Sequence, residues 1–199
     1  MRGHVIGLTG RAGSGKSTVA EMIHELRGDW TVVSEGVADR LKISAARALG
    51  MSVSDEDLIK NMDSLKIDGS VSWEMGPHHS EITGRRYLQL YGTEAHREVF
   101  GDNFWIDQAL PDPCAPYYGR KDPFDLLVFT DVRYQNEAER IRECGGEVWL
   151  IDRPSVEDLP DSHASENIDF HVDTRIINNG TLDDLHDAVD RELCYSVLA

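Results

Sequence analysis

The chain has 199 residues, 40% of them hydrophobic, which suits one globular domain or one core with inserted segments. Its 20 basic and 36 acidic residues give a formal net charge of -16, the wrong sign for a protein that binds nucleic acid through the phosphate backbone. The three cysteines are far apart and include no C-x-x-C pair, and no apolar run reaches the length of a membrane span. We therefore expect a cytoplasmic protein that binds neither nucleic acid nor membrane.

Short apolar runs with the length and β-branched or aromatic content of buried strands recur along the chain. The five runs are His4–Leu8, Trp30–Val33, Leu126–Thr130, Glu147–Ile151 and Thr174–Asn178. Segments of helical periodicity follow them, namely Val19 to Gly28, Val37 to Gly50, Ser54 to Met62, Asn136 to Cys144 and Thr181 to Leu193. This alternation predicts an α/β fold in three layers, with a five-stranded, mostly parallel sheet and helices on both faces.

The alternation stops between about Gly50 and Pro123, where helical patterns occur without intervening strands. We therefore predict a core of residues 1–50 and 124–199 and an inserted helical lobe of about residues 51–123. Within the lobe, Gly69–Ser80 is predicted as a loop and Pro111–Pro123 as the return path to the sheet. Lobes of this kind usually carry substrate contacts.

A phosphate-binding motif lies between the first strand and the first helix. Gly10–Ser17 satisfies G-x-x-x-x-G-K-[ST], in which glycines let backbone N–H groups surround phosphate oxygens at a helix N-terminus. Lys16 would reach the β- and γ-phosphates and Ser17 would bind magnesium. The motif predicts a P-loop NTPase fold and a nucleotide site made by Gly10, Ala12, Gly13, Ser14, Gly15, Lys16, Ser17 and Thr18.

The P-loop alone does not name a reaction, because switches, motors and kinases all carry it. The D-x-x-G and N-K-x-D motifs of a GTPase are absent from the chain, and the chain is short for a motor ATPase. A compact kinase that acts on a small acceptor remains, with a regulatory nucleotide-binding module as the competing class.

The third apolar run ends in a carboxylate, which is where P-loop proteins place the acid that orients magnesium. Asp131 is this candidate, and the alternative is an aspartate that only ends a strand. Arg133 and Arg140 follow, and guanidinium groups stabilise the charge that develops in phosphoryl transfer. Arg133 is the stronger candidate, because Arg140 and Arg142 could pair with glutamates on the surface of their helix, namely Glu137, Glu139 and Glu143.

A second polar set lies in the inserted lobe. Gln89, Thr93 and Arg97 are spaced by four residues and would share one face of a helix if Gly92 does not break it, with Arg86 close by. An amide that reads a base edge and an arginine that holds a monophosphate would form an acceptor site. A polar face exposed to solvent is an equally good interpretation.

Five further segments have sequences typical of a known family: Ala38–Lys42, Leu88–Arg97, Asn103–Ile106, Thr130–Glu139 and Ser162–Glu166. The D-V-R-x-x-N-E-A-E and L-Q-x-x-G-T-E-x-x-R patterns among them are much more specific than the P-loop. Together the segments resemble the bacteriophage deoxynucleoside monophosphate kinases. In addition, Ile176–Leu182 is similar to the strand–loop–helix that flanks adenine in nucleoside monophosphate kinases and dephospho-coenzyme A kinases.

The resemblance implies transfer of the ATP γ-phosphoryl group to a deoxynucleoside monophosphate (dNMP), with magnesium, to supply DNA precursors in a host cytoplasm. It implies a lid of about residues 133–145, with Asp131 and Arg133 near the transferred group. It also implies that Asn178 and Asn179 lie beside adenine and that Asp39, Lys42, Gln89 and Arg97 lie at the acceptor. Arg86, Thr93 and Arg140 are further substrate-binding candidates that the resemblance does not itself supply. Animal-type phosphomevalonate kinases share the P-loop and a D-V-R-like segment, so an isoprenoid phosphate is the alternative acceptor. The oligomeric state is left open, with a homodimer among the options.

Overall fold

The structure of the protein is a computed structural model that describes residues 3–75, 78–110, 124–155 and 168–198. For residues 73–75, 78–80, 197 and 198 it describes the backbone alone. The predicted return path Pro111–Pro123 and the Ser162–Glu166 segment lie outside the described residues. The chain divides into two compact units, one of Met1–Val37 with Leu110–Ala199 and one of Ala38–Ala109.

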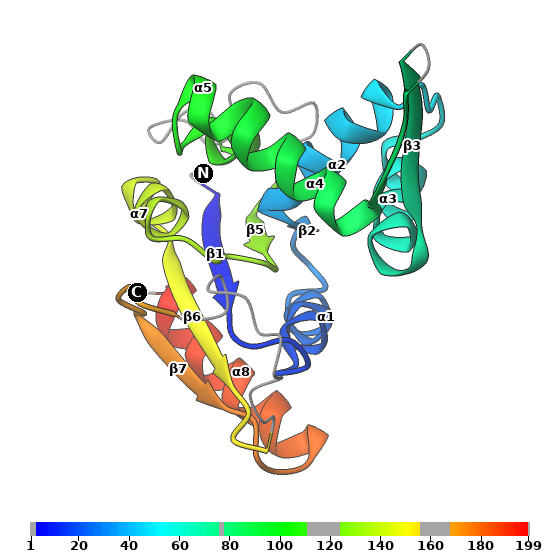
Figure 1. The fold of residues 1–199 in the computed structure, drawn as a ribbon. Coiled ribbons are helices and arrows are strands. Elements are labelled where there is room, and N and C mark those ends of the chain that lie inside the picture. Colours follow the sequence, from blue (N-terminus) through cyan, green and yellow to red (C-terminus); the bar gives the residue numbers. More distant parts are fainter. Residues whose placement is uncertain (1–2, 76–77, 111–123, 156–167, 199) are drawn as a thin grey trace. The chain divides into compact units, whose positions relative to one another are not determined.

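The first unit is built on a parallel sheet of five described strands, in the order β2-β5-β1-β6-β7 (Figure 1). The strands are β1 (His4–Thr9), β2 (Val32–Glu35), β5 (Leu126–Phe129), β6 (Glu147–Asp152) and β7 (Thr174–Ile177). Every pairing between them is parallel. The α/β fold and all five predicted strands are confirmed, with boundaries that differ by at most a few residues.

Helices cover both faces of this sheet, and the central strand is apolar on both sides for that reason. Ile6 and Leu8 share a buried cluster with side chains of α1 (Lys16–Leu26) and α8 (Leu182–Leu198). On the opposite side, Gly7 faces α7 (Gln135–Glu143), and a Cβ at Gly7 would lie 2.6 Å from Cδ1 of Ile141. Glycine at this position lets the helix approach the strand closely.

The predicted lid of about residues 133–145 includes α7, whose Ala138 and Ile141 are buried. A lid function for this segment stays a prediction. The glycines that follow the first two helices differ. Gly50 has a left-handed φ of +82°, whereas α1 ends at Leu26 and Gly28 lies outside the left-handed region. In α8, Leu182 at the start is exposed, while Leu185, Val189 and Leu193 are buried.

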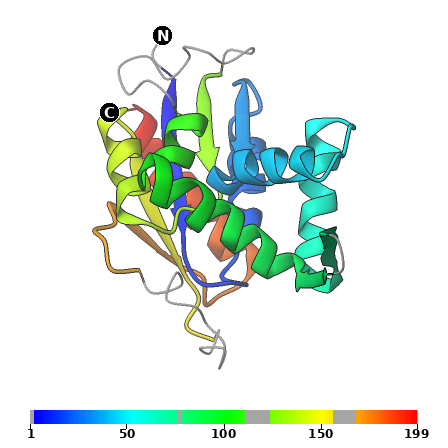
Figure 2. The same ribbon diagram turned by 45° about the horizontal axis from the view of Figure 1, so that its top comes forward.

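The second unit consists of helices and one hairpin. Its elements are α2 (Val37–Ala48), α3 (Asp55–Asp68), β3 (Ser70–Met75), β4 (His78–Thr83), α4 (Gly84–Gly92), the π-helix η1 (Thr93–Arg97), α5 (Glu98–Phe100) and α6 (Phe104–Ala109). Figure 2 shows α4, η1 and α5 as one helical run, drawn in green. The unit has its own core, in which Ala45 and Ala46 of α2 pack with Leu58, Met62 and Leu88. Because of this packing, α2 groups with the second unit and not, as we expected of residues 1–50, with the first.

The segment Gly69–Ser80 contains strand structure where the sequence predicted a loop. Strands β3 and β4 pair antiparallel, with Ser70 opposite Thr83 and Trp73 opposite Ser80. The signal was present in the sequence, since Val71, Trp73 and Met75 alternate with polar residues, as a strand with two different faces requires. The following Gly76-Pro77 pair supplies the composition of a turn.

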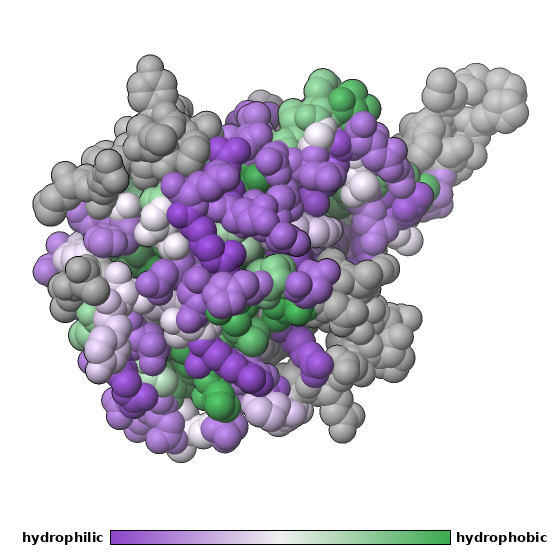
Figure 3. Space-filling view, turned by 90° about the vertical axis from the view of Figure 1, so that its left-hand side faces the viewer, coloured by the Kyte–Doolittle hydropathy of each residue, from purple (hydrophilic) through white to green (hydrophobic). Residues whose placement is uncertain are grey.

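Figure 3 shows one face of the molecule on which hydrophilic residues predominate and apolar ones form small separate patches. None of the helices in the described part of the chain is long and apolar enough to cross a membrane.

Candidate active site

The P-loop leaves the end of β1 and enters α1 through three glycines in the left-handed region. Gly10, Gly13 and Gly15 have φ angles of +144°, +76° and +106°. Side chains other than glycine rarely adopt such angles, so the motif glycines are required by the backbone path. Gly15 immediately precedes the first residue of α1, and the free N–H groups of that helix end lie at the loop.

Two side chains of the loop fit an anionic ligand. Lys16 donates hydrogen bonds from Nζ to the carbonyl oxygens of Gly10 (2.7 Å) and Arg11 (2.8 Å), which holds the ammonium group at the loop. The hydroxyl Oγ of Ser14 is buried and has no hydrogen-bond partner among the described residues. A buried hydroxyl without a partner is costly. Loop N–H groups, an ammonium group and a spare hydroxyl therefore suit a phosphate chain.

Lys16, Asp131 and Arg133 line one pocket of the first unit. The full lining is Thr9, Gly10, Ala12, Lys16, Asp131, Val132, Arg133 and Ile168. Oδ1 of Asp131 accepts the backbone N–H of Val37 at 2.6 Å, which orients the carboxylate. The structure thus brings the three predicted catalytic residues together, while their roles stay predictions.

Glu137 positions the segment that carries Asp131 and Arg133. One interpretation of the sequence made Glu137 a surface partner of the arginines of α7, but Glu137 is buried, with an exposed fraction of 3%. Its Oε2 accepts the backbone N–H groups of Arg133 (2.9 Å) and Tyr134 (3.2 Å). A glutamate three residues after the residue that caps a helix can bend back and accept backbone N–H groups at the helix start. This spacing is the sequence signal that could have identified Glu137.

The ends of β6 and β7 hold the other side of the P-loop. Nδ2 of Asn178 donates to the carbonyl oxygen of Ser14 at 2.8 Å, so this side chain braces the loop. Nη1 of Arg153, directly after β6, lies 3.5 Å from the carbonyl oxygen of Gly13. No motif or spacing in the sequence points to Arg153. Asn179 is exposed, and the place of both asparagines beside adenine stays a prediction.

The predicted magnesium ligands are few. The side chain of Ser17 is exposed at the first turn of α1, and Asp131 lines the same pocket as Lys16. Within the described ranges, no three histidine, cysteine, aspartate or glutamate side chains form a metal-binding group. This donor set fits Mg²⁺, which usually takes one or two protein oxygens and completes its shell with water and substrate phosphates.

In the second unit, Asp39 and Lys42 of α2 belong to an ionic cluster with Asp63 of α3. Nζ of Lys42 lies 3.1 Å from Oδ1 of both aspartates. Burial lowers the pKa of Lys42, but the two carboxylates and their hydrogen bonds outweigh it and raise the pKa above 10.5. Lys42 therefore stays charged at neutral pH. No pattern in the sequence points to Asp63, because it lies 21 residues after Lys42 and on another helix.

The helical run through Gln89, Thr93 and Arg97 is unbroken at Gly92, but its geometry changes there. From Thr93 onward the run is a π-helix, and the amide of Glu98 bonds to the carbonyl oxygen of Thr93, five residues back. A step of four no longer completes a turn, so Arg97 leaves the line that α-helical spacing predicted. Gln89 and Arg97 are half-buried and Thr93 is exposed.

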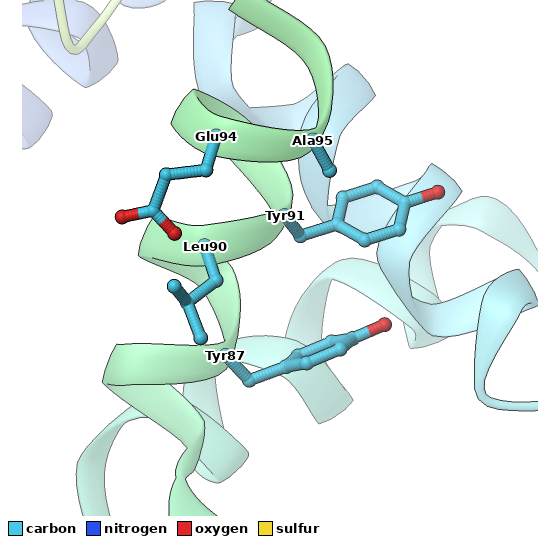
Figure 4. Close-up of a pocket in the computed structure, with 5 residues that line it drawn as sticks. All are labelled: Tyr87, Leu90, Tyr91, Glu94 and Ala95. Carbon is cyan, nitrogen blue, oxygen red and sulfur yellow. The ribbon is translucent and has the colours of Figure 1, made fainter. Parts of the chain in front are cut away.

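An open pocket of about 440 Å³ lies along α4 and η1 in the second unit (Figure 4). Its lining is Tyr87, Leu90, Tyr91, Glu94 and Ala95. The two tyrosine hydroxyls are fixed to α2, since Tyr87 donates to the carbonyl oxygen of Ala45 (3.0 Å) and Tyr91 bonds with Ser44 (2.9 Å). None of the predicted acceptor residues is among the lining residues.

The two remaining acceptor candidates have carboxylate partners. Nη2 of Arg86 lies 3.4 Å from Oε1 of Glu94, and both side chains are about half exposed. Nε of Arg140 lies 3.4 Å from Oε2 of Glu143, as the alternative interpretation of α7 expected. Arg142 pairs with Asp173. Arg133 thus remains the arginine of this region that lines the P-loop pocket.

Comparisons with known proteins agree with the resemblance seen in the sequence. Residues 32–189 match the family model described as deoxynucleotide monophosphate kinase. A protein of Acanthamoeba polyphaga mimivirus, named "Putative deoxynucleotide monophosphate kinase", is 28% identical over 203 residues, which cover 93% of each chain. The deoxynucleoside-5'-monophosphate kinase of Escherichia phage T5 is 36% identical over 73 residues, 35% of this chain and 26% of that protein.

The dephospho-CoA kinase of Corynebacterium glutamicum is more distantly similar, with 28% identity over 197 residues that cover 91% of each chain. The family match covers more than half of the chain and includes α2, the ionic cluster, α4, Asp131 and Arg133. The chain therefore belongs to the deoxynucleotide monophosphate kinase family.

Proposed function

We propose that this protein is an ATP-dependent kinase that phosphorylates deoxynucleoside monophosphates to the diphosphates, as its family and its viral relatives suggest. The observation that carries the proposal is the P-loop pocket, where Lys16, Asp131 and Arg133 meet within one compact unit. The loop would hold the phosphates of ATP. Production of DNA precursors in a host cytoplasm is the role that fits this reaction.

The chemistry needs little more than positioning and charge neutralisation. The attacking atom is an oxygen of the dNMP phosphate, which is already anionic, so no strong general base is required. Lys16 and Arg133 would neutralise the charge on the phosphoryl oxygens while the P-O bond to the ADP leaving group breaks. The N–H groups of the P-loop would hold the phosphates that stay with ADP.

Magnesium, when bound with the nucleotide, would offset the charge of the β- and γ-phosphates. Ser17 and Asp131 are the residues that would hold it. The Val37 amide restrains Oδ1 of Asp131, so the carboxylate is set in orientation before any ligand arrives. In the second unit, we propose that Gln89 and Arg97 hold the monophosphate acceptor. Asp39 and Lys42 would also lie at the acceptor.

The decisive measurement is ADP release in a coupled assay with ATP and a panel of acceptors: dTMP, dGMP, dCMP, dAMP and phosphomevalonate. We expect turnover that depends on a dNMP. Turnover with phosphomevalonate alone, or slow hydrolysis that is indifferent to the acceptor, would contradict the proposal.

The Lys16→Ala variant should lower turnover about 10²- to 10³-fold, the usual cost of removing one group that stabilises transition-state charge. Its circular dichroism spectrum should remain that of the wild type. Lys60→Ala is the matched control, because Lys60 is an exposed lysine that pairs only with a neighbouring glutamate of its own helix among the described residues. Near wild-type transfer by Lys16→Ala would show that the catalytic assignment is wrong.

A further inference from the structure

Arg153 lies at the edge of the P-loop, and no sequence motif includes it. It directly follows β6, its side chain is exposed, and its Nη1 reaches the carbonyl oxygen of Gly13 at 3.5 Å. Gly13 is one of the glycines whose left-handed conformation shapes the loop. The guanidinium group is therefore at the edge of the place where the loop would surround phosphate oxygens.

The charge of Arg153 is not neutralised within the described part of the chain. No described carboxylate lies within ion-pair distance of it, and the carboxylate of its neighbour Asp152 is engaged by Nε of Arg175 at 3.1 Å. Arg140 and Arg142, in contrast, each have a carboxylate partner. In a chain with a net charge of -16, an arginine without such a partner beside a phosphate-binding loop favours an anionic ligand.

The backbone that carries Arg153 is fixed to the loop by neighbouring bonds. The amide of Asn178 donates to the carbonyl oxygen of Asp152 at 2.7 Å, and the Asn178 side chain donates to the carbonyl oxygen of Ser14. The strand ends and the P-loop thus form one hydrogen-bonded frame. These bonds hold the backbone of Arg153 beside the loop.

We propose that Arg153 contacts the phosphate chain of the donor nucleotide, an assignment that rests on the proposed function for its donor, ATP. Guanidinium has five N–H donors, so a bond to the Gly13 carbonyl leaves the others for phosphate oxygens. Arg153 then adds a positive charge on the side of the loop formed by β6, while Lys16 and Arg133 act from the pocket.

The test compares Arg153→Gln with Arg191→Gln, a matched control that removes the same charge from an exposed position on α8. ATP and inorganic tripolyphosphate are titrated by calorimetry, without turnover. We expect Arg153→Gln to weaken both ligands about ten- to hundredfold, the size of a lost charge-assisted hydrogen bond. Arg191→Gln should stay within about twofold of the wild type.

Kinetics give a second readout. Arg153→Gln should raise the KM for ATP and leave the KM for dNMP unchanged, because only one substrate loses a contact. Arg153→Lys should recover part of the affinity, since it restores the charge without the planar fork.

Three results would overturn the proposal: a loss of ATP affinity no larger than that of Arg191→Gln, tripolyphosphate binding that is unaffected while ATP binding weakens, or an equal rise in both KM values. The second result would place Arg153 at the base or ribose. Failure of the proposed function looks different, since ATP would bind and respond to Arg153→Gln while no dNMP was phosphorylated.

Discussion

Individual residues of the P-loop are constrained by backbone angle and by space in different ways. Gly13 has a left-handed φ of +76°, and apart from its chain neighbours no heavy atom of the described residues lies within 4 Å of a Cβ built there. Gly15 has a φ of +106°, and a Cβ there would lie 2.7 Å from Nδ2 of Asn178. Substitutions at the two glycines therefore distinguish backbone strain, which both would cause, from loss of the hydrogen bond between Asn178 and Ser14, which only a side chain at position 15 would cause.

Gly15→Ala should weaken ATP binding and lower the melting temperature more than Gly13→Ala does. Both substitutions add strain of about 1–2 kcal/mol in the left-handed region, but only Gly15→Ala also displaces the Asn178 amide from Ser14. Thermal unfolding and ATP titration of the two variants measure the difference. Equal effects would mean that the bond from Asn178 to Ser14 contributes nothing to the loop.

At this scale, the sequence predicted the residues that depend on local chain geometry. The P-loop residues, Asp131 and Arg133 follow from strand ends and motif spacing, and the structure brings Lys16, Asp131 and Arg133 to one pocket. Asp63 and Arg153 could not be found in this way. Each contacts a segment far away in the chain, and no periodicity encodes such a contact.

Among the elements, the junction of α4 and η1 depends on a glycine that is buried. A Cβ at Gly92 would lie 2.3 Å from Cδ1 of Leu41 on α2. Nε1 of Trp105 donates to the Gly92 carbonyl oxygen at 3.0 Å, so that this carbonyl has a partner where the helix changes its hydrogen-bond pattern. The glycine in the L-Q-x-x-G-T-E pattern thus lets two helices of the second unit touch.

Gly92→Ala should destabilise the protein by about 1–3 kcal/mol, the usual cost of overpacking a core. Gly28→Ala is the control, because its nearest neighbour would be 3.6 Å from the added Cβ and its φ is ordinary. Urea denaturation monitored by near-ultraviolet circular dichroism gives both free energies of unfolding. If the two variants were equally stable, α2 and α4 would not be in close contact at this point.

Whether a segment is a helix or a strand was easier to predict than the compact unit to which it belongs. Each parallel strand of the first unit contains a short run of β-branched or other apolar residues, which predicts a buried strand, whereas apolar and polar residues alternate in the sequence of β3 and the following glycine and proline favour a loop. The sequence also placed α2 with the first unit because it follows β2. Its contacts with Leu58 and Met62 reverse that assignment, and such contacts are not visible in the pattern of one helix.

The chain has a formal net charge of -16, and it divides into two units with separate apolar cores. We assign the donor nucleotide to the first unit and the acceptor to the second. Each ligand should therefore stabilise a different set of backbone amides.

Hydrogen exchange tests this assignment. ATP alone should slow exchange of the amides of Gly10–Ser17, and a dNMP alone should slow exchange in α4 and η1. A dNMP that protected only the first unit would show that Gln89 and Arg97 are not the acceptor residues. Inorganic phosphate at equal ionic strength serves as the control for nonspecific anion effects.

The strand order has a consequence for the way the chain assembles during synthesis. The central strand β1 is made first, yet its neighbours are β5 and β6, where His4 lies opposite Leu126 and Ile6 opposite Glu147. β2 likewise pairs with β5, which is synthesised later, and Val32 lies opposite Leu126. The whole of Ala38–Ala109 leaves the ribosome before any ladder of the sheet can form, so the nested unit can fold first while Ile6 and Leu8 stay uncovered on the nascent chain.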